Sequence, residues 1–199
     1  MNQDRRDRLR DAAVTVLAGA GGRGLTHRAV DMAAAVPLGT AKNYFPTRDA
    51  LLRAAAERCL EQYRALTARL AGTGPGPADR AGLATLLAGL LRDVAGPGRP
   101  RVLAYLELQT EAARRPWLAA LLDPIGSADF AAHERLLRAA GLAAGPDRAR
   151  ALTLALHGAI PHLLAGAPDT LAAAGLDDPD GFARGVLACV CPQPPEEET

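Results

Sequence analysis

Apolar residues recur at spacings of three and four along most of the 199-residue chain, and no stretch alternates between apolar and polar positions. The first spacing is the period of an amphipathic helix, whereas alternation would be typical of a strand, so the pattern predicts an all-α fold. A first helix is expected over residues 2–20, with Leu9, Ala13, Val16 and Leu17 on one apolar face. Later helices are expected at residues 48–71, 79–95, 100–114, 116–141, 147–165 and 179–190.

Residues 25–52 contain a more specific pattern, in which two short helices and a tight turn precede the start of a longer helix. Pro37 separates the two short helices, because a proline disfavours the helical region for the residue before it and suits the first turn of a new helix. The second short helix is expected at residues 38–45, with Ala41 and Phe45 on its inner side and small or polar residues opposite. A short helix of this kind can enter the major groove of DNA.

The distribution of charge agrees with a nucleic-acid-binding first part. The whole chain has a net charge of +1, but residues 1–58 hold ten Lys or Arg against six Asp or Glu, which leaves +4 in this segment and −3 in the remainder. Lys42, in the second short helix, is the only lysine of the chain. A basic segment joined to a weakly acidic one is typical of a nucleic-acid module attached to a second domain.

Residues 39–52 read GTAKNYFPTRDALL and resemble the signature of the TetR (tetracycline-repressor) family, and the match extends back through residues 26–28 and Val36. The resemblance implies an N-terminal three-helix DNA-binding bundle with a helix-turn-helix, followed by a C-terminal helical effector-binding and dimerisation domain. Two positions depart from the family pattern. Ala35 stands at a turn position usually held by Gly, where a left-handed conformation would cost on the order of 1 kcal/mol. Leu38 stands where a polar base-reading residue is common, so a thymine methyl contact is an alternative there.

The resemblance also assigns residues to the DNA contact. Hydroxyl groups that contact phosphates are expected at Thr26, Thr40 and Tyr44, and base edges or nearby backbone are expected to be met by Arg28, Leu38, Gly39, Lys42 and Asn43. Arg48 is expected to reach a phosphate flanking the groove. For Arg28 a plain surface charge is the alternative, and for Tyr44 it is half-buried packing. Helix starts favour anions and Gly39 permits close backbone approach, so the chemistry agrees with these assignments.

The remainder of the chain predicts a dimer and a ligand pocket. We expect a DNA-binding domain at residues 1–52, an effector-binding and dimerisation domain at 53–191, and a disordered Pro- and Glu-rich tail at 192–199. The segment 147–165 is apolar nearly all round, so we expect it to be buried on more than one side. The simplest way to bury it is a homodimer whose interface is formed by segments 147–165 and 179–190 of both copies. Bulky or polar residues that could line a pocket are Tyr105, Gln109, Trp117, Phe130, His133 and His157. For the aromatic residues the alternative is plain core packing, and for the histidines a hydrogen-bonded core or solvent-edge position.

The other chemistry of the chain is sparse. Cys59, Cys189 and Cys191 form no metal-ligand spacing, and no nucleophile–base pair or phosphate-binding loop is visible, so we expect no cofactor, no metal and no enzyme. No signal peptide or membrane-length apolar run is present, and a cytoplasmic bacterial protein is expected. The leading hypothesis is a dimeric repressor released from a pseudo-palindromic DNA operator by a small molecule. The alternatives are an activator, a regulator controlled by a protein partner, or an all-helical enzyme or ligand carrier.

Overall fold

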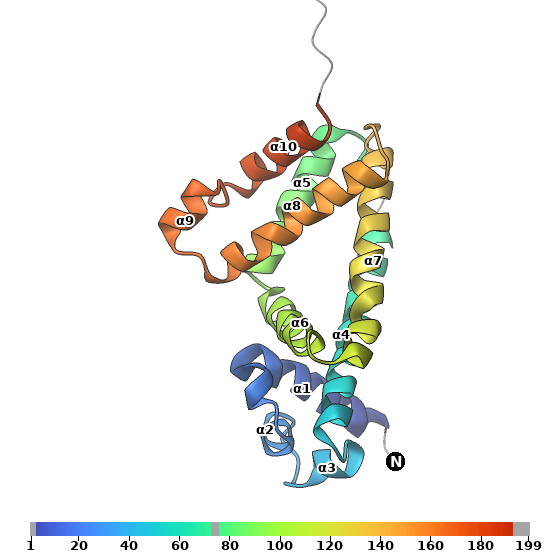
Figure 1. The fold of residues 1–199 in the computed structure, drawn as a ribbon, viewed down its shortest axis with the longest axis vertical. Helices are drawn as coiled ribbons and strands as arrows, with labels where there is room; N and C mark the ends of the chain where they lie inside the picture. The colour runs from blue at the N-terminus through green and yellow to red at the C-terminus, as the bar shows by residue number, and fades with distance from the viewer. Residues whose placement is uncertain (1–2, 73–75, 193–199) are drawn as a thin grey trace, which may run out of the picture. The chain divides into compact units, whose positions relative to one another are not determined.

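The computed structural model describes residues 3–72 and 76–192, apart from the side chains of residues 69–72. Every regular element in these ranges is a helix, which confirms the all-α prediction (Figure 1). The helices are α1 (Gln3–Gly24), α2 (His27–Ala33), α3 (Thr40–Tyr44), α4 (Arg48–Gly72), α5 (Arg80–Ala95), α6 (Arg99–Ala112), α7 (Pro116–Ala139), α8 (Pro146–Ala165), α9 (Pro168–Ala173) and α10 (Pro179–Val190).

The chain packs as two compact units. The first contains Met1–Gly72 and Gly98–Gly126, and the second contains Thr73–Pro97 and Ser127–Thr199. Helix α4 runs through residue 52 inside the first unit, so the functional boundary expected there is not marked by packing and stays a prediction. Residues 193–199 of the expected disordered tail lie outside the described residues.

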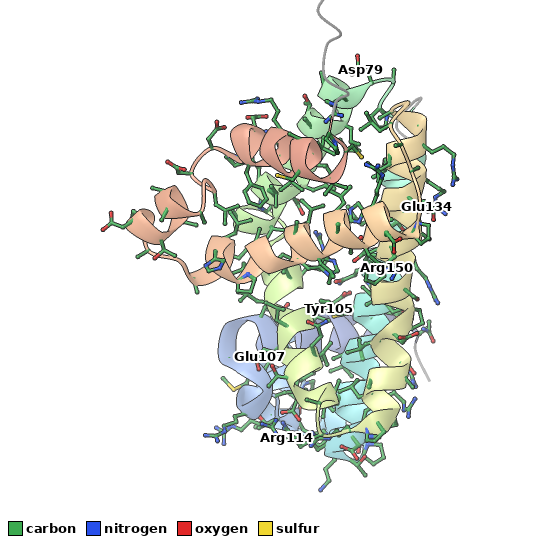
Figure 2. The ribbon with its side chains drawn as sticks, turned by 45° about the horizontal axis from the view of Figure 1, so that its top comes forward. Asp79, Tyr105, Glu107, Arg114, Glu134 and Arg150 are labelled. Carbon is green, nitrogen blue, oxygen red and sulfur yellow. The ribbon has the colours of Figure 1, made fainter. Side chains whose placement is uncertain are left out.

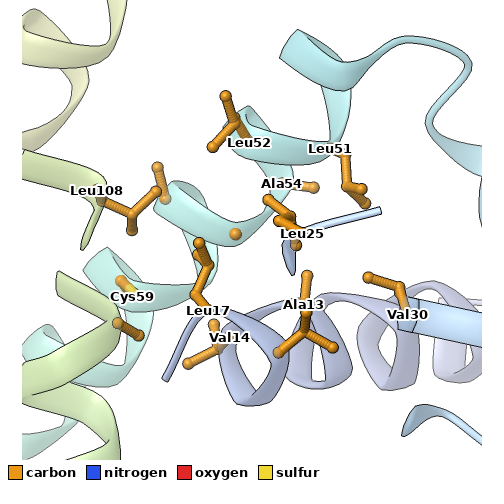
Figure 3. Packing of buried hydrophobic residues seen from close by; sticks show 14 of the residues in the cluster. Ala13, Val14, Leu17, Leu25, Val30, Leu51, Leu52, Ala54, Cys59 and Leu108 are labelled. Atoms are coloured by element: carbon orange, nitrogen blue, oxygen red, sulfur yellow. The ribbon is translucent and has the colours of Figure 1, made fainter. Parts of the chain in front are cut away.

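The core of the first unit joins the short N-terminal helices to α4 and α6. Leu17 and Val30 are fully buried, as are Leu52 of α4 and Leu108 of α6 (Figure 3). Leu9 of α1 is fully buried in the same core. Burying a side chain of this size contributes about 1.5–3 kcal/mol relative to leaving it exposed. The packing of α6 on α1 and α4 therefore makes α6 part of the same folded body as the two short helices.

The second unit has a separate core between α5, α8 and α10. Leu83 and Leu87 of α5 are fully buried with Leu152 of α8 and Leu187 of α10. Arg80, at the start of α5, donates hydrogen bonds to the carbonyl oxygens of Leu187 and Cys191, which closes the end of α10. Helix α10 is thus held against α5 by both apolar and polar contacts.

Several boundaries differ from the expectation. The bounds of α1 reach Gly24, but its helical backbone is interrupted at Gly21, where φ is 68° and ψ is −178°, so the first regular stretch ends near residue 20 as expected and a short further turn follows. α3 begins at Thr40 rather than at residue 38, because Gly39 takes a left-handed conformation with φ 91° and stands as its N-cap. The short helix α9 was not expected from the sequence.

Candidate nucleic-acid interface

Helix α3 is attached to the first unit by its inner side. Ala41 is fully buried and Phe45 is nearly so, which confirms the predicted inner face. The guanidinium carbon of Arg6 lies 5.3 Å from the centre of the Phe45 ring, at a distance suited to a cation–π contact. The orientation of a five-residue helix therefore depends on two buried side chains rather than on its own length.

Asp31 fixes the start of α3 from the neighbouring helix. Its carboxylate is fully buried, and its two oxygens accept hydrogen bonds from the backbone N–H groups of Gly39, at 2.7 Å, and Ala41, at 2.6 Å. The side chain thus does for α3 what an N-capping residue would do, although it belongs to α2. Sequence reasoning missed this residue; the available signal was an acidic residue beside the apolar positions of α2.

The turn between α2 and α3 has the predicted unusual backbone. Ala35 has φ 51°, which confirms the left-handed conformation expected at this position. The amide of Val36 donates to the Asp31 carbonyl and the amide of Thr40 donates to the Pro37 carbonyl, so both ends of the turn are hydrogen-bonded. The hydrogen bonds of the neighbouring residues therefore hold the turn in a shape that keeps Ala35 in its strained left-handed conformation.

The outer side of α3 faces solvent. Leu38, Gly39, Lys42 and Asn43 are exposed, and Thr40 and Tyr44 on the flanks are half-buried. On α2 and its cap, Thr26 and Arg28 are also exposed. The residues predicted to touch DNA thus lie on the accessible parts of two neighbouring helices.

The three threonines of this region differ in how their hydroxyl groups are used. Thr26 accepts from the amide of Ala29 at 3.1 Å, and Thr47 accepts from the amide of Ala50 at 3.0 Å, so each caps the helix that follows it. Accepting leaves the hydroxyl hydrogen of Thr26 free to donate to a phosphate oxygen. The hydroxyl of Thr40 instead donates to the carbonyl of Pro37.

Arg48 has a structural role that the sequence did not reveal. Its guanidinium donates to the carbonyl oxygen of Leu25 at 2.7 Å and to that of Gly22 at 2.6 Å, and Glu111 of α6 lies 3.7 Å away. These contacts join the start of α4 to the end of α1 and to the chain before α2. The phosphate contact expected of Arg48 stays a prediction. To make it, the guanidinium must reach the phosphate while it is hydrogen-bonded to the carbonyl oxygens of Leu25 and Gly22, or must release them.

Two further polar contacts position the short helices. His27 is half-buried, and its Nε2 lies 2.6 Å from the carbonyl oxygen of Phe45, to which a protonated Nε2 donates. Glu107 accepts from the amide of Gly22 at 2.7 Å, so α6 holds the end of α1 just beyond its kink (Figure 2). Both contacts join residues far apart in the sequence, so no local sequence pattern could predict them.

The six expected pocket residues are divided between the two units. The first unit holds Tyr105, Gln109 and Trp117, and the second holds Phe130, His133 and His157. Gln109 donates to the Tyr105 hydroxyl at 3.1 Å, and the Trp117 ring lies 4.7 Å from the guanidinium carbon of Arg53 and packs partly buried against the first core. Their role in ligand binding stays a prediction.

Two histidines of the second unit, His133 and His157, are hydrogen-bonded to other side chains. His133 is buried, and its Nδ1 lies 2.8 Å from the hydroxyl oxygen of Thr153, which itself donates to the carbonyl of Ala149. The hydroxyl can therefore only accept from His133, which places a proton on Nδ1. Burial lowers the pKa of His133, with the nearby Asp129 acting in the opposite direction. The Nε2 of His157 lies 3.0 Å from a carboxylate oxygen of Asp129.

An apolar groove of about 480 Å³ lies in the second unit, and its lining differs from the expected pocket residues. Its walls come from α8, α10 and the chain between α9 and α10, and they include Ala155, Phe182, Gly185, Val186 and Cys189. Most of these residues belong to α8 and α10, the two segments expected to form a dimer interface.

Other chemistry is limited in the described part of the chain. Within residues 3–72 and 76–192, no group of three or more His, Cys, Asp or Glu side chains is arranged to hold a metal ion. No helix there combines the length and apolarity needed to cross a membrane. Burial raises the pKa of the Cys59 thiol to about 12, so this cysteine behaves as a small apolar core residue.

A family model and several solved structures match this chain. A family model described as "Tetracyclin repressor-like, C-terminal domain" matches residues 78–188. No curated protein matches the chain. A TetR-family member from Streptomyces coelicolor is 31% identical with a TM-score of 0.66, over 96% of this chain and 99% of that one.

Two further solved structures are similar. The multidrug binding protein EbrR, solved in complex with ethidium, is 31% identical with a TM-score of 0.67, over 95% of this chain and 99% of that one. A transcriptional regulator from a Rhodococcus species is 22% identical with a TM-score of 0.72, over 96% of this chain and 99% of that one, and this likeness concerns the fold alone.

Proposed function

Because the chain belongs to the TetR family of regulators, we propose that it is a homodimeric transcriptional repressor that leaves a pseudo-palindromic operator when a small molecule binds. The observation that carries the DNA-binding part is the exposed polar side of α3, held in place by Ala41, Phe45 and the Asp31 carboxylate. A helix fixed in this way loses little conformational freedom on entering a major groove. We expect the protein to act in the bacterial cytoplasm, where its DNA is.

The proposed contacts divide into two kinds. Phosphate contacts are proposed for Thr26, Tyr44 and Arg48, and for Thr40 once its hydroxyl turns from the Pro37 carbonyl to the phosphate. Base-edge or nearby backbone contacts are proposed for Arg28, Leu38, Gly39, Lys42 and Asn43. Phosphate contacts position the protein and base contacts give sequence preference. Residues 1–52 are the proposed DNA-binding domain, and residues 53–191 are proposed to carry effector binding and dimerisation.

The proposed dimer interface uses the exposed sides of α8 and α10, which lie side by side (Figure 1). On α8, Ala151 and Gly158 are exposed with Leu154, whose exposed fraction of 61% is unusual for a leucine. On α10, Gly185 and Cys189 are exposed one turn apart. A stripe of small residues lets helices approach closely, and a second copy of the same surface is self-complementary under twofold symmetry.

The proposed effector is a small apolar or amphipathic molecule. Structures of EbrR contain ethidium and proflavin, and its 31–32% identity to this chain supports a ligand of comparable aromatic character. Tyr105, Gln109, Trp117, Phe130, His133 and His157 remain the residues proposed to meet it, because they combine bulk or polarity with an otherwise Ala- and Leu-rich surrounding.

Selection from a pool of random DNA duplexes tests the proposal, because such a selection finds the operator sequence by itself. We expect the protein to enrich an inverted repeat whose half-sites are spaced for two recognition helices. A gel shift with that duplex should weaken when ethidium or proflavin is added at concentrations that leave the shift of an unrelated DNA-binding protein unchanged, a control that is needed because both dyes also intercalate into DNA. Absence of any enriched duplex at low salt would reject DNA binding. An enriched duplex that neither dye displaces would leave DNA binding intact and reject effectors of this class.

A further inference from the structure

Leu38 is an exposed leucine in the turn just before the proposed recognition helix α3. Its exposed fraction is 66%, and in the described part of the chain the other large apolar residues with high exposure are Met32 and Leu154. Leu154 lies in the proposed dimer interface, so that exposure there has a separate explanation. Leu38 lies between Pro37 and Gly39 in the turn that leads into α3, and it is exposed, as are Lys42 and Asn43 on α3 itself.

The backbone around Leu38 is fixed before any partner arrives. The amide and hydroxyl of Thr40 both donate to the Pro37 carbonyl, and the amide of Gly39 donates to the buried carboxylate of Asp31. Pro37 restricts its own backbone, and Gly39 adopts a left-handed conformation that other residues rarely take. An apolar side chain is thus presented to solvent by a turn that has little freedom to withdraw it.

The chemistry of Leu38 restricts what it can recognise in a major groove. Its side chain neither donates nor accepts a hydrogen bond, so it cannot read the donors and acceptors of guanine, adenine or cytosine. The apolar group that unmodified DNA offers in this groove is the 5-methyl group of thymine. Covering that methyl group also covers part of the leucine, which removes apolar surface from water on both sides.

We propose that Leu38 contacts the 5-methyl group of a thymine in each operator half-site, at the base pair that faces the N-terminal end of α3 in the major groove. This inference rests on the proposed DNA-binding function and makes it more specific, because it names a base that the operator must contain. Lys42 and Asn43 supply hydrogen-bonding groups beside this position, so Leu38 adds a preference that they do not provide.

The test replaces thymines of the selected operator by deoxyuridine, one position at a time, which removes only the methyl group. Each half-site should contain one thymine whose replacement matters. Replacing it in a single half-site should weaken binding about fourfold, and replacing it in both half-sites about fifteenfold, as expected for one buried methyl group per half-site. The variant Leu38→Ala should bind the thymine and deoxyuridine duplexes with equal affinity. Its melting temperature should stay unchanged, because the side chain is exposed.

Met32→Ala is the matched control, because Met32 has the same exposed fraction of 66% but lies on α2. This variant should keep the full dependence on the thymine methyl groups. An operator whose affinity is indifferent to every deoxyuridine replacement would overturn the inference while leaving DNA binding established. A methyl dependence that persists in Leu38→Ala would assign the contact to another residue. Failure to select any duplex would overturn the proposed function and this inference with it.

Discussion

Asp31 is a buried acidic residue whose two carboxylate oxygens both accept backbone hydrogen bonds at the start of α3. A helix of five residues cannot nucleate by itself, because fixing its first turn costs more than one hydrogen bond returns. The carboxylate supplies acceptors for two amides, one of which, that of Ala41, lies in a buried residue. The side that faces DNA in our proposal therefore depends on a residue that faces the protein interior.

Replacing Asp31 by Ala should lower the free energy of unfolding by about 2–4 kcal/mol, because it leaves two backbone N–H groups without an acceptor. Asp79→Ala is the control, since Asp79 is an exposed cap that accepts from the amide of Gly82, and its loss should cost about 1 kcal/mol. Urea denaturation measures both values. Equal effects of the two substitutions would show that Asp31 is an ordinary cap.

His133 gives the second unit a dependence on pH. Its pKa is lowered chiefly by burial, with Asp129 raising it and His157 lowering it, so below about pH 6.5 the unfolded chain binds a proton that the folded chain resists. Stability linked to this group is therefore complete at higher pH and is lost as the pH falls. The melting temperature of His133→Gln should fall less between pH 7.5 and pH 5 than that of the wild type. His162→Gln, at an exposed position, should behave as the wild type does.

At the scale of single residues, the sequence predicted features that depend on neighbours along the chain. Thr26 and Thr47 as caps, and the left-handed Ala35, follow from local rules about helix starts and turns. Asp31 and Arg48 were not predicted in their structural roles, because their partners are set by how helices pack. A side chain that can serve either a phosphate or a carbonyl oxygen looks the same in the sequence.

At the scale of elements, the helical period predicted where most helices lie but not which helices share a body. α6 packs with α1 and α4, and Glu107 holds the amide of Gly22 across a separation of 85 residues. The apolar residues of α6 predict that one of its sides is buried, but they do not identify the helix that packs on that side. The break in α1 at Gly21 lies close to the predicted end of the first helix, but the short turn after it, where the Gly22 amide meets Glu107, was not predicted.

Gly158 of α8 offers a test of the proposed helix-to-helix contact between subunits. A Cβ added at this exposed position would meet no atom of another element within 4 Å, so we expect the monomer to accept a larger residue there. In a dimer that brings α8 close to its partner, Gly158→Leu should prevent close approach and weaken dimerisation at least tenfold. Sedimentation equilibrium measures the dissociation constant.

Gly89→Leu is the matched control for this experiment. Gly89 is also an exposed helical glycine with open space around it, but it lies on α5, outside the proposed interface. Its replacement should leave the dissociation constant unchanged. Dimerisation that tolerates Gly158→Leu as well as Gly89→Leu would show that α8 does not meet its partner at this residue.

At the scale of the whole molecule, the segment GTAKNYFPTRDALL allowed the family and its all-α architecture to be predicted from sequence. The second unit was less predictable, because Ala and Leu fill both cores and give few residues that stand out. The aromatic and histidine residues chosen for a pocket fall in two packing units, and an apolar groove lies elsewhere, along α8 and α10. Composition alone does not distinguish a residue that lines a cavity from one that fills a core.

The salt dependence of operator binding by the wild type and by Lys42→Ala tests the central claim most directly, because Lys42 is exposed on the outer side of α3. We predict steep weakening with salt for the wild type, and for Lys42→Ala an affinity about tenfold lower with a salt slope smaller by about one per subunit. Arg64→Ala, which removes an exposed cation elsewhere in the first unit, should leave both unchanged. An operator affinity and salt slope that Lys42→Ala does not alter would contradict the account.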